Sequence, residues 1–78
     1  MTGVEVTLRG ALAGQVPRLP DGRGRVELSD DPTFATLLGT LGLPVAPYVA
    51  VVNGTAVRGA APLADGDRVE IHPPMAGG

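Results

Sequence analysis

Three segments of the chain, 4–8, 25–29 and 68–72, alternate between apolar and polar residues. Successive side chains of a β-strand point to opposite faces, so this period of two predicts three strands, each with one face toward a core. The first two strands are expected to form a hairpin across a long loop over 10–24, which contains several glycines and prolines. The residues predicted to point inward are Val4, Val6, Leu8, Val26, Leu28, Val69 and Ile71.

The pattern changes to a helical period in the middle of the chain. The segment 30–33, Asp-Asp-Pro-Thr, predicts a helix start, because Asp31 or Thr33 can cap the first amides and proline fits the first turn. Gly42 is expected to end the helix. A glycine inside it, Gly39, costs up to ~1 kcal/mol relative to alanine and so indicates a close packing contact. The apolar stripe has the spacing i, i+3, i+4, i+7 and consists of Phe34, Leu37, Leu38 and Leu41.

Further strands are predicted in the C-terminal half. The run 48–52 is almost entirely apolar and rich in valine, which is typical of a strand buried on both faces or near the centre of a sheet. Asn53-Gly54 predicts a tight hairpin turn, with 55–57 as the short return strand. The segment 63–67 predicts a turn before the last strand. Pro73-Pro74 ends that strand, because proline has no amide proton to donate.

One amphipathic helix and four or five strands predict a single α+β domain. At 78 residues the chain buries only roughly 60% of its unfolded surface, so the core is small and leaves little room for an enclosed active site. We expect residues 1–73 to form the domain and residues 74–78 to form a flexible tail.

Composition excludes several classes of function. Six arginines, no lysine and eight acidic residues give a net charge of −2, which disfavours binding to nucleic acid. The chain has no cysteine and therefore no disulfide, thiolate nucleophile or cysteine metal site. We expect no membrane association, because no apolar run is long enough to span a bilayer. The N-terminal segment does not resemble a signal peptide, so the expected location is the cytoplasm.

No set of catalytic or metal-binding side chains is recognisable. His72 is the only histidine, and we interpret it as an outward residue on the last strand, close enough to the tail to touch a partner. Asp30 and Asp31 are better explained by the positive end of the helix dipole than by a cation. The segment 65–67 lacks the closing glutamate of a calcium loop. The segment 22–25, Gly-Arg-Gly-Arg, has no aromatic residues around it on which bases could stack.

The chemistry that remains lies in the last two residues, Gly77 and Gly78. A diglycine is poor for stability because glycine loses the most backbone entropy when it becomes ordered. Without side chains, however, the C-terminus can pass through a narrow channel and present its carboxylate to another enzyme. The alternative is a frayed chain end, where glycine is also common.

Three motifs occur in order along the C-terminal third: 51–54 (Val-Val-Asn-Gly), 62–69 (Pro-Leu-Ala-Asp-Gly-Asp-Arg-Val) and 73–78 (Pro-Pro-Met-Ala-Gly-Gly). With them the chain resembles the ubiquitin-like sulfur-carrier proteins of the MoaD/ThiS superfamily. These include the small subunit of molybdopterin synthase and the sulfur carrier of the thiamine pathway. The resemblance implies a β-grasp fold, with a mixed sheet of four or five strands and one main helix. Strands 4–8 and 68–72 are then parallel neighbours at its centre.

The resemblance also implies a role for the tail. A ubiquitin-activating-like adenylyltransferase uses ATP to adenylate Gly78, which then becomes a thiocarboxylate and donates sulfur to a biosynthetic enzyme. The residues that occupy the partner's channel are Pro74, Met75, Ala76 and Gly77. The chain itself is then a carrier and not an enzyme, it binds no cofactor, and it is a monomer when free. It shares in catalysis only if it is the small subunit of a molybdopterin synthase.

Several alternatives stay open at this stage. The first loop lacks the aromatic and acidic pattern associated with molybdopterin synthase small subunits, and Ala76 replaces their usual Ser or Thr. The acceptor pathway can therefore be that of molybdenum cofactor, thiamine, cysteine or a specialised metabolite. The chain can instead be a ubiquitin-like modifier conjugated through Gly78, or an interaction domain whose diglycine is incidental. The expected docking face lies on the last strand and comprises Arg68, Glu70 and His72.

Overall fold

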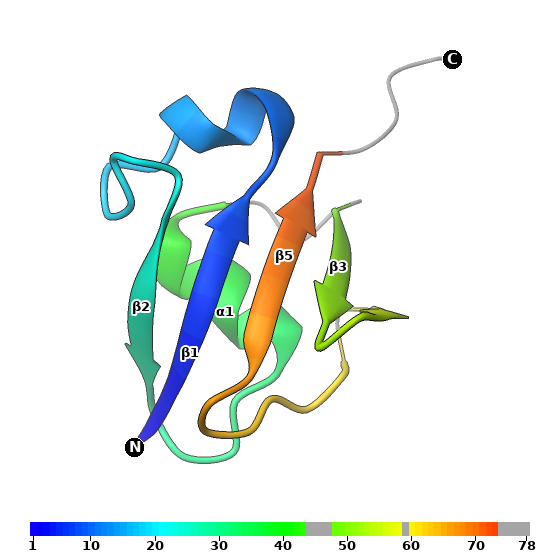
Figure 1. Cartoon of the computed structure of the whole chain (residues 1–78). Helices are drawn as coiled ribbons and strands as arrows, with labels where there is room; N and C mark the ends of the chain where they lie inside the picture. Colours follow the sequence, from blue (N-terminus) through cyan, green and yellow to red (C-terminus); the bar gives the residue numbers. More distant parts are fainter. Residues whose placement is uncertain (44–47, 59, 74–78) are drawn as a thin grey trace.

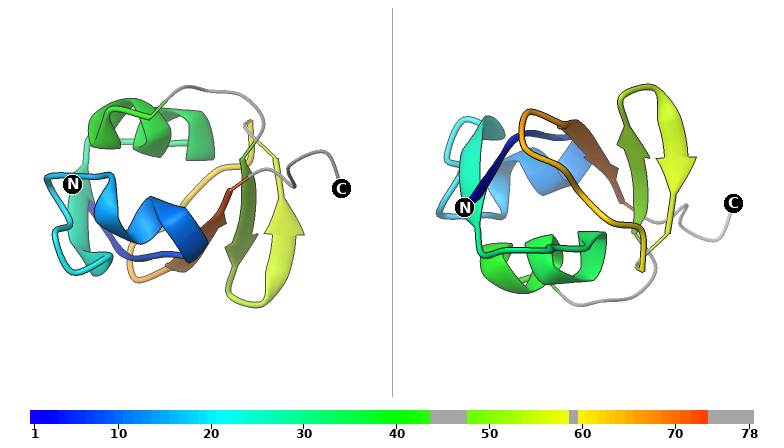
Figure 2. Two further views of the ribbon diagram at one scale, coloured as in Figure 1. Left: turned by 90° about the horizontal axis from the view of Figure 1, so that it is seen from above. Right: turned by 90° about the horizontal axis from the view of Figure 1, so that it is seen from below.

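The computed structural model describes residues 1–43, 48–58 and 60–73. Five strands form one sheet in the order β2-β1-β5-β3-β4, and helix α1 lies across one face of it (Figure 1). Figure 2 shows the helix and the strands as two layers. The predicted β-grasp architecture is therefore confirmed. The elements are β1 (Thr2–Leu8), the 3-10 helix η1 (Gly10–Gly14), β2 (Arg23–Leu28), α1 (Phe34–Leu41), β3 (Val49–Val52), β4 (Thr55–Val57) and β5 (Arg68–His72).

The two central strands, β1 and β5, run parallel, as the family resemblance implies. On one side β2 pairs antiparallel with β1, and on the other side β3 pairs antiparallel with β5. The β3–β4 hairpin forms the second edge of the sheet. Because β1 and β5 point the same way, both strands finish at the same end of the sheet, and the C-terminal residues follow β5 in the chain (Figure 1).

The core lies between α1 and the facing side of the sheet. All seven strand residues predicted to point inward are buried, and so is the complete apolar stripe of α1. Burial of this apolar surface is the main driving force for folding. No polar or charged side chain is buried among the residues that the structure describes.

The segment 10–24 is more ordered than the sequence predicts. It contains η1, and β2 begins at Arg23, two residues earlier than expected. Three of its apolar residues, Leu12, Val16 and Leu19, join the core with exposed fractions of 4% or less. Their spacing of i, i+4 and i+7 fits a helical period, but the glycines and prolines among them indicate a loop, so the sequence pattern did not predict that these residues are buried.

Helix α1 has the predicted bounds but different local chemistry. Thr33 caps it: its hydroxyl accepts from the Thr36 amide at 3.2 Å, and the Thr36 hydroxyl accepts from the Thr33 amide at 3.2 Å. Two interpretations are wrong. Gly39 has no packing contact, because no heavy atom lies within 4 Å of where its Cβ would be. The first turn holds no acidic residue, and Asp30 instead lies 3.4 Å from the N-terminal amine of Met1.

Strand β3 begins one residue later than predicted and is buried on one face only. Ala50 is fully buried, whereas Val49 is 46% exposed, so burial on both faces is wrong. The hairpin turn after β3 has the predicted backbone, with φ of 51° at Asn53 and 88° at Gly54. The Asn53 side chain also ties the turn to the start of β5. Its Nδ2 donates to Asp67 Oδ1 at 2.9 Å, and its Oδ1 accepts from the Arg68 amide at 2.9 Å.

Candidate functional site

The sheet face turned away from α1, called here the open face, carries the predicted docking residues. Val69 and Ile71 are buried on the helix side of β5, and Arg68, Glu70 and His72 alternate with them on the open face. The side chains of Glu70 and His72 are 39% and 40% exposed. The structure therefore places these three residues where the sequence predicts them, accessible to a partner.

Pairing across the sheet surrounds these residues with both charged and apolar neighbours. Glu70 lies opposite Thr7 on β1 and Val51 on β3, and His72 lies opposite Val49. The open face thus changes from charged positions on β2, β1 and β5 to the apolar positions of β3.

Glu70 is the centre of a small polar cluster on this face. Arg9 Nε donates to Glu70 Oε1 at 3.0 Å, and His72 Nε2 lies 3.5 Å from the same oxygen. All three side chains are substantially exposed, so water screens their interactions and each contributes little to stability. The cluster is consequently available to rearrange against a partner at low energetic cost.

The C-terminal residues begin where β5 ends. His72 pairs with the first residue of β3, and the Pro73 ring lies beside Gly10, whose Cβ would be 3.4 Å from Pro73 Cγ. Gly10 has a φ of 58°, a left-handed conformation that glycine adopts without strain. The chain therefore leaves the sheet between the start of η1 and the start of β3. The predicted carrier residue and channel residues, Pro74, Met75, Ala76, Gly77 and Gly78, lie outside the described residues.

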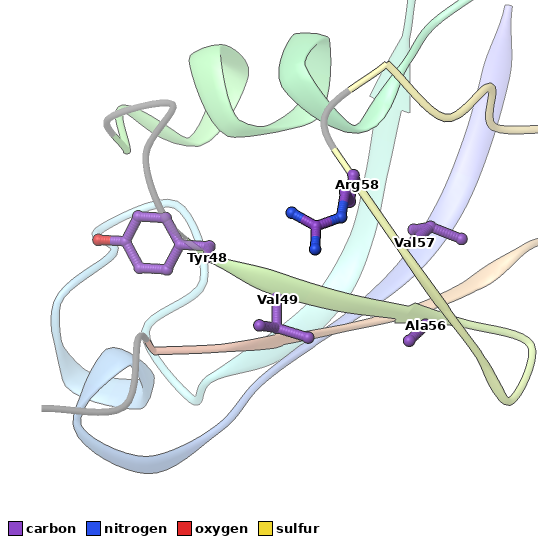
Figure 3. A pocket seen from close by; sticks show the side chains of 5 residues that line it. All are labelled: Tyr48, Val49, Ala56, Val57 and Arg58. Atoms are coloured by element: carbon purple, nitrogen blue, oxygen red, sulfur yellow. The ribbon is translucent and has the colours of Figure 1, made fainter. Parts of the chain in front are cut away.

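A shallow hollow of about 240 Å³ adjoins this exit point. It is lined by Tyr48 and Val49 at the start of β3 and by Ala56, Val57 and Arg58 at the end of β4 (Figure 3). Figure 3 shows the Arg58 side chain extending from the end of β4 toward Tyr48 and Val49. The hollow is smaller than a typical cofactor pocket, which measures roughly 300–1,000 Å³. Sequence reasoning missed it, because the valine run was interpreted as a strand buried on both faces or near the centre of the sheet, and the exposure of Val49 was not expected.

The described residues contain no group of three or more His, Cys, Asp or Glu placed to hold a metal ion. No helix among them is long and apolar enough to cross a membrane. The structure presents an accessible sheet face and an apolar hollow with an arginine at its rim. The C-terminal segment begins beside both.

Comparisons with known proteins give one family match and several structural likenesses. The model of the ThiS family matches residues 12–78. Among curated proteins, none matches the chain in sequence. A Pyrococcus furiosus protein assigned as molybdopterin converting factor, subunit 1, has a similar structure, with a TM-score of 0.74 and 20% identity over 96% of this chain and 100% of that one.

Two crystal structures from Haloferax volcanii are also similar. One is of SAMP1, with a TM-score of 0.68 and 24% identity over 97% of this chain and 99% of that one. The other is of small archaeal modifier protein 1, with a TM-score of 0.71 and 22% identity over 96% of this chain and 100% of that one. At these identities the structural likeness supports the fold.

Proposed function

Because this chain belongs to the ThiS family, within the MoaD/ThiS superfamily of ubiquitin-fold sulfur carriers, we propose that Gly78 carries sulfur as a C-terminal thiocarboxylate. The observation that carries the proposal is the extent of the family match, which continues through the diglycine to residue 78. The likeness is therefore not confined to the folded domain, and it includes the segment that would be modified.

The chemistry requires a partner enzyme. A carboxylate is a poor electrophile, so the Gly78 carboxylate first attacks the α-phosphorus of ATP, which forms an acyl-adenylate and releases pyrophosphate. Sulfide then attacks the acyl carbon, and AMP leaves with the electrons of the broken C–O bond. The product is a thiocarboxylate whose sulfur is transferred to the acceptor enzyme. None of these steps uses a side chain of the carrier.

The tail is suited to this route by its residue types. Gly77 and Gly78 have no side chains, and Met75 and Ala76 can line an apolar channel. Pro74, after Pro73, favours an extended backbone. The tail can thus reach an active site that the domain itself cannot enter.

We further propose that the activating enzyme docks on Arg68, Glu70 and His72. These residues lie on β5, the strand that leads directly to the tail, and they face away from the core. Arg68→Glu is expected to weaken binding to the activating enzyme while the melting curve stays close to that of the parent, because exposed charges act mainly on association. Gly39→Glu, on α1 at the opposite side of the sheet, serves as the control and should bind normally. Equal affinities for both variants would place the interface elsewhere.

A second candidate is a protein modifier attached through Gly78. The observation that favours it is the likeness to a protein named small archaeal modifier protein 1. The chain contains no lysine, so it can be joined to lysines of other proteins without forming side-chain-linked chains of itself. Both candidates share the adenylation step and differ in the group that takes the acyl carbon.

Intact-mass spectrometry of the protein isolated from its source separates the candidates. The mass first establishes whether Gly78 is the C-terminal residue of the mature protein. A carrier shows the exchange of one oxygen for one sulfur, localised to Gly78 by fragmentation. Because the chain has no cysteine, thiol-specific alkylation of the intact protein reports the thiocarboxylate alone. A modifier shows instead an amide bond between Gly78 and a lysine of another protein. If neither product forms with an activating enzyme from the same genome, both proposals are wrong.

A further inference from the structure

Charged residues are unevenly distributed along the long direction of the sheet. Each pair of opposite residues in β1 and β5 defines a level along the sheet. We divide the molecule into two halves between two such levels, that of Glu5 with Arg68 and that of Thr7 with Glu70. The part from the Thr7 level to the ends of β1 and β5 is called the tail-end half, because the C-terminal residues leave from it (Figure 1). The part from the Glu5 level to the beginnings of these strands is called the far half.

Backbone pairing places each charged residue in one half. In the tail-end half, Arg23 lies opposite Thr7, Arg9 donates its amide to the Ile71 carbonyl, and Arg58 follows the residue paired with Ala50. The loop between η1 and β2 belongs to the same half, because the Leu8 amide donates to the Gly22 carbonyl. The charged residues of the tail-end half are Arg9, Arg18, Arg23 and Arg58, with Asp21 and Glu70.

The far half is strongly acidic. Its two arginines stand against six carboxylates, and hydrogen bonds from the Gly3 and Glu5 amides hold the turn 65–67 there. The acidic residues are Glu5, Glu27, Asp30, Asp31, Asp65 and Asp67, and the arginines are Arg25 and Arg68. The residues that the structure leaves undescribed have no ionisable side chain, so this division accounts for every charged side chain of the chain. A protein of net charge −2 therefore has a basic half from which its tail emerges.

Ion pairs form within each half and leave its net charge unchanged, and they determine which charged groups stay unpaired. Arg25 lies within 4.0 Å of both Glu27 and Asp65 in the far half. Among the charged groups of the described residues, Arg18, Arg23 and Arg58 have no ion-pair partner within that distance. The basic half therefore keeps most of its positive charge available to a partner.

The length of the tail determines which half meets the activating enzyme. Five residues, 74–78, span at most about 18 Å when fully extended. An active site that receives Gly78 must lie within that reach of Pro73, so the enzyme surface around the channel comes against the tail-end half. Strand β1, with seven residues, is about 23 Å long, which is more than two Debye lengths at physiological ionic strength. The carboxylates beyond its far end are largely screened from that contact.

We propose that the tail-end half docks on an acidic surface surrounding the tail channel of the activating enzyme, with Arg23 and Arg58 facing carboxylates of that surface. Opposite potentials orient the carrier tail-first and raise the rate of productive encounter, since they attract the tail-end half, with Arg68 at the level that borders it, and repel the carboxylates of the far half. The hollow beside Arg58 accepts an apolar side chain from the same surface. This inference rests on the proposed function and adds the chemistry of the partner's surface.

The test is pyrophosphate exchange with the ubiquitin-activating-like enzyme of the same genome, measured against carrier concentration. The variant Arg23→Glu/Arg58→Glu is compared with the parent at about 0.15 M salt, the low-salt condition, and at about 1 M salt, where the Debye length is ~8 Å and ~3 Å. At low salt we expect the KM for the carrier to rise at least ~10-fold, within the range of electrostatic effects on association, with kcat unchanged. At high salt the difference should disappear. If Arg23→Glu/Arg58→Glu melts at a lower temperature than the parent, Arg23→Gln/Arg58→Gln gives a second measurement, for which a smaller rise in KM is expected.

Asp30→Arg is the control, because it changes the net charge by two units at an exposed position of the far half. Its KM should stay within ~2-fold of the parent value, since the change lies beyond effective screening distance. If net charge alone mattered, Asp30→Arg, with two units of charge change against four, would lower the KM by about half the double variant's rise on a logarithmic scale, and that result would overturn the inference. Normal exchange by both arginine variants at low salt would also overturn it while leaving the sulfur-carrier proposal intact. Absence of exchange by the parent with any such enzyme would refute the proposed function and this inference together.

Discussion

Replacement of Phe34 by alanine tests whether the α1 stripe holds the domain together. Phe34 is the first residue of the helix, is 1% exposed, and is the largest side chain of the fully buried core. Truncation of a buried phenylalanine to alanine typically costs ~3–5 kcal/mol, from lost transfer free energy and from the cavity that remains. A domain of 78 residues has a free energy of unfolding of roughly 4–12 kcal/mol. Phe34→Ala should therefore remove a large part of the stability.

The measurement is urea denaturation followed by far-ultraviolet circular dichroism, with thermal melting alongside. Since 1 kcal/mol shifts the melting temperature of such a domain by about 4–8 °C, a fall of at least ~12 °C is expected. The m-value should stay unchanged if the folded variant keeps the same buried surface.

Gly39→Ala is the matched control on the same helix. The added Cβ meets no atom within 4 Å and the position is exposed, so alanine should stabilise the helix by about 0.5–1 kcal/mol. An unchanged midpoint for Phe34→Ala would refute the assignment of this side chain to the core. A loss of stability in Gly39→Ala would show that the glycine has a packing role after all.

Three further predictions concern the turn, the helix cap and the tail. Asn53→Ala should lower the free energy of unfolding by about 1–2 kcal/mol in urea denaturation, because alanine is strained in the left-handed backbone and the hydrogen bonds to Asp67 and the Arg68 amide are lost. Asn53→Gly removes only the hydrogen bonds and should cost less. Equal costs for the two variants would contradict the strain argument. Thr33→Ala should lower the free energy of unfolding by ~0.5–2 kcal/mol through loss of the cap, and an unaltered midpoint would refute the capping role. Deletion of residues 77–78 should change the free energy of unfolding by less than ~0.5 kcal/mol and abolish pyrophosphate exchange; unfolding on truncation would make the tail structural.

Much of the fold could be predicted because its signals are local. The alternation around Val69 and Ile71 and the stripe from Phe34 to Leu41 each repeat at the period of one element, and each was confirmed. The turn at Asn53-Gly54 was predictable for the same reason, since the left-handed backbone it needs favours these two residue types. The core residues of the segment 10–24 were not predicted, because the glycines and prolines among them indicate a loop despite their helical spacing, and because they gain their burial only from elements far along the chain.

The candidate site divides in the same way. The positions of Arg68, Glu70 and His72 on the open face followed from strand alternation, because a one-residue step always changes the face. The role of Gly78 was inferred from residue type and resemblance, and it stays a proposal because the tail lies outside the described residues. The exposure of Val49 and the hollow beside it were missed, since an apolar run reads the same whether one face of its strand is covered or two.

The sequence alone determined which segments form strands, which face of each is apolar and where the helix begins and ends, because these depend on neighbours within a few residues. The tertiary structure decided which strands are adjacent, and with that the position of every charge relative to the tail. Arg9, Arg23 and Arg58 are scattered along the chain. The antiparallel pairing of β1 with β2 brings Arg23 beside the end of β1, and the pairing of β5 with β3 and of β3 with β4 brings Arg58 to the same end. Electrostatic potential depends on distance in space, so no pattern along the chain reveals the basic half from which the tail emerges.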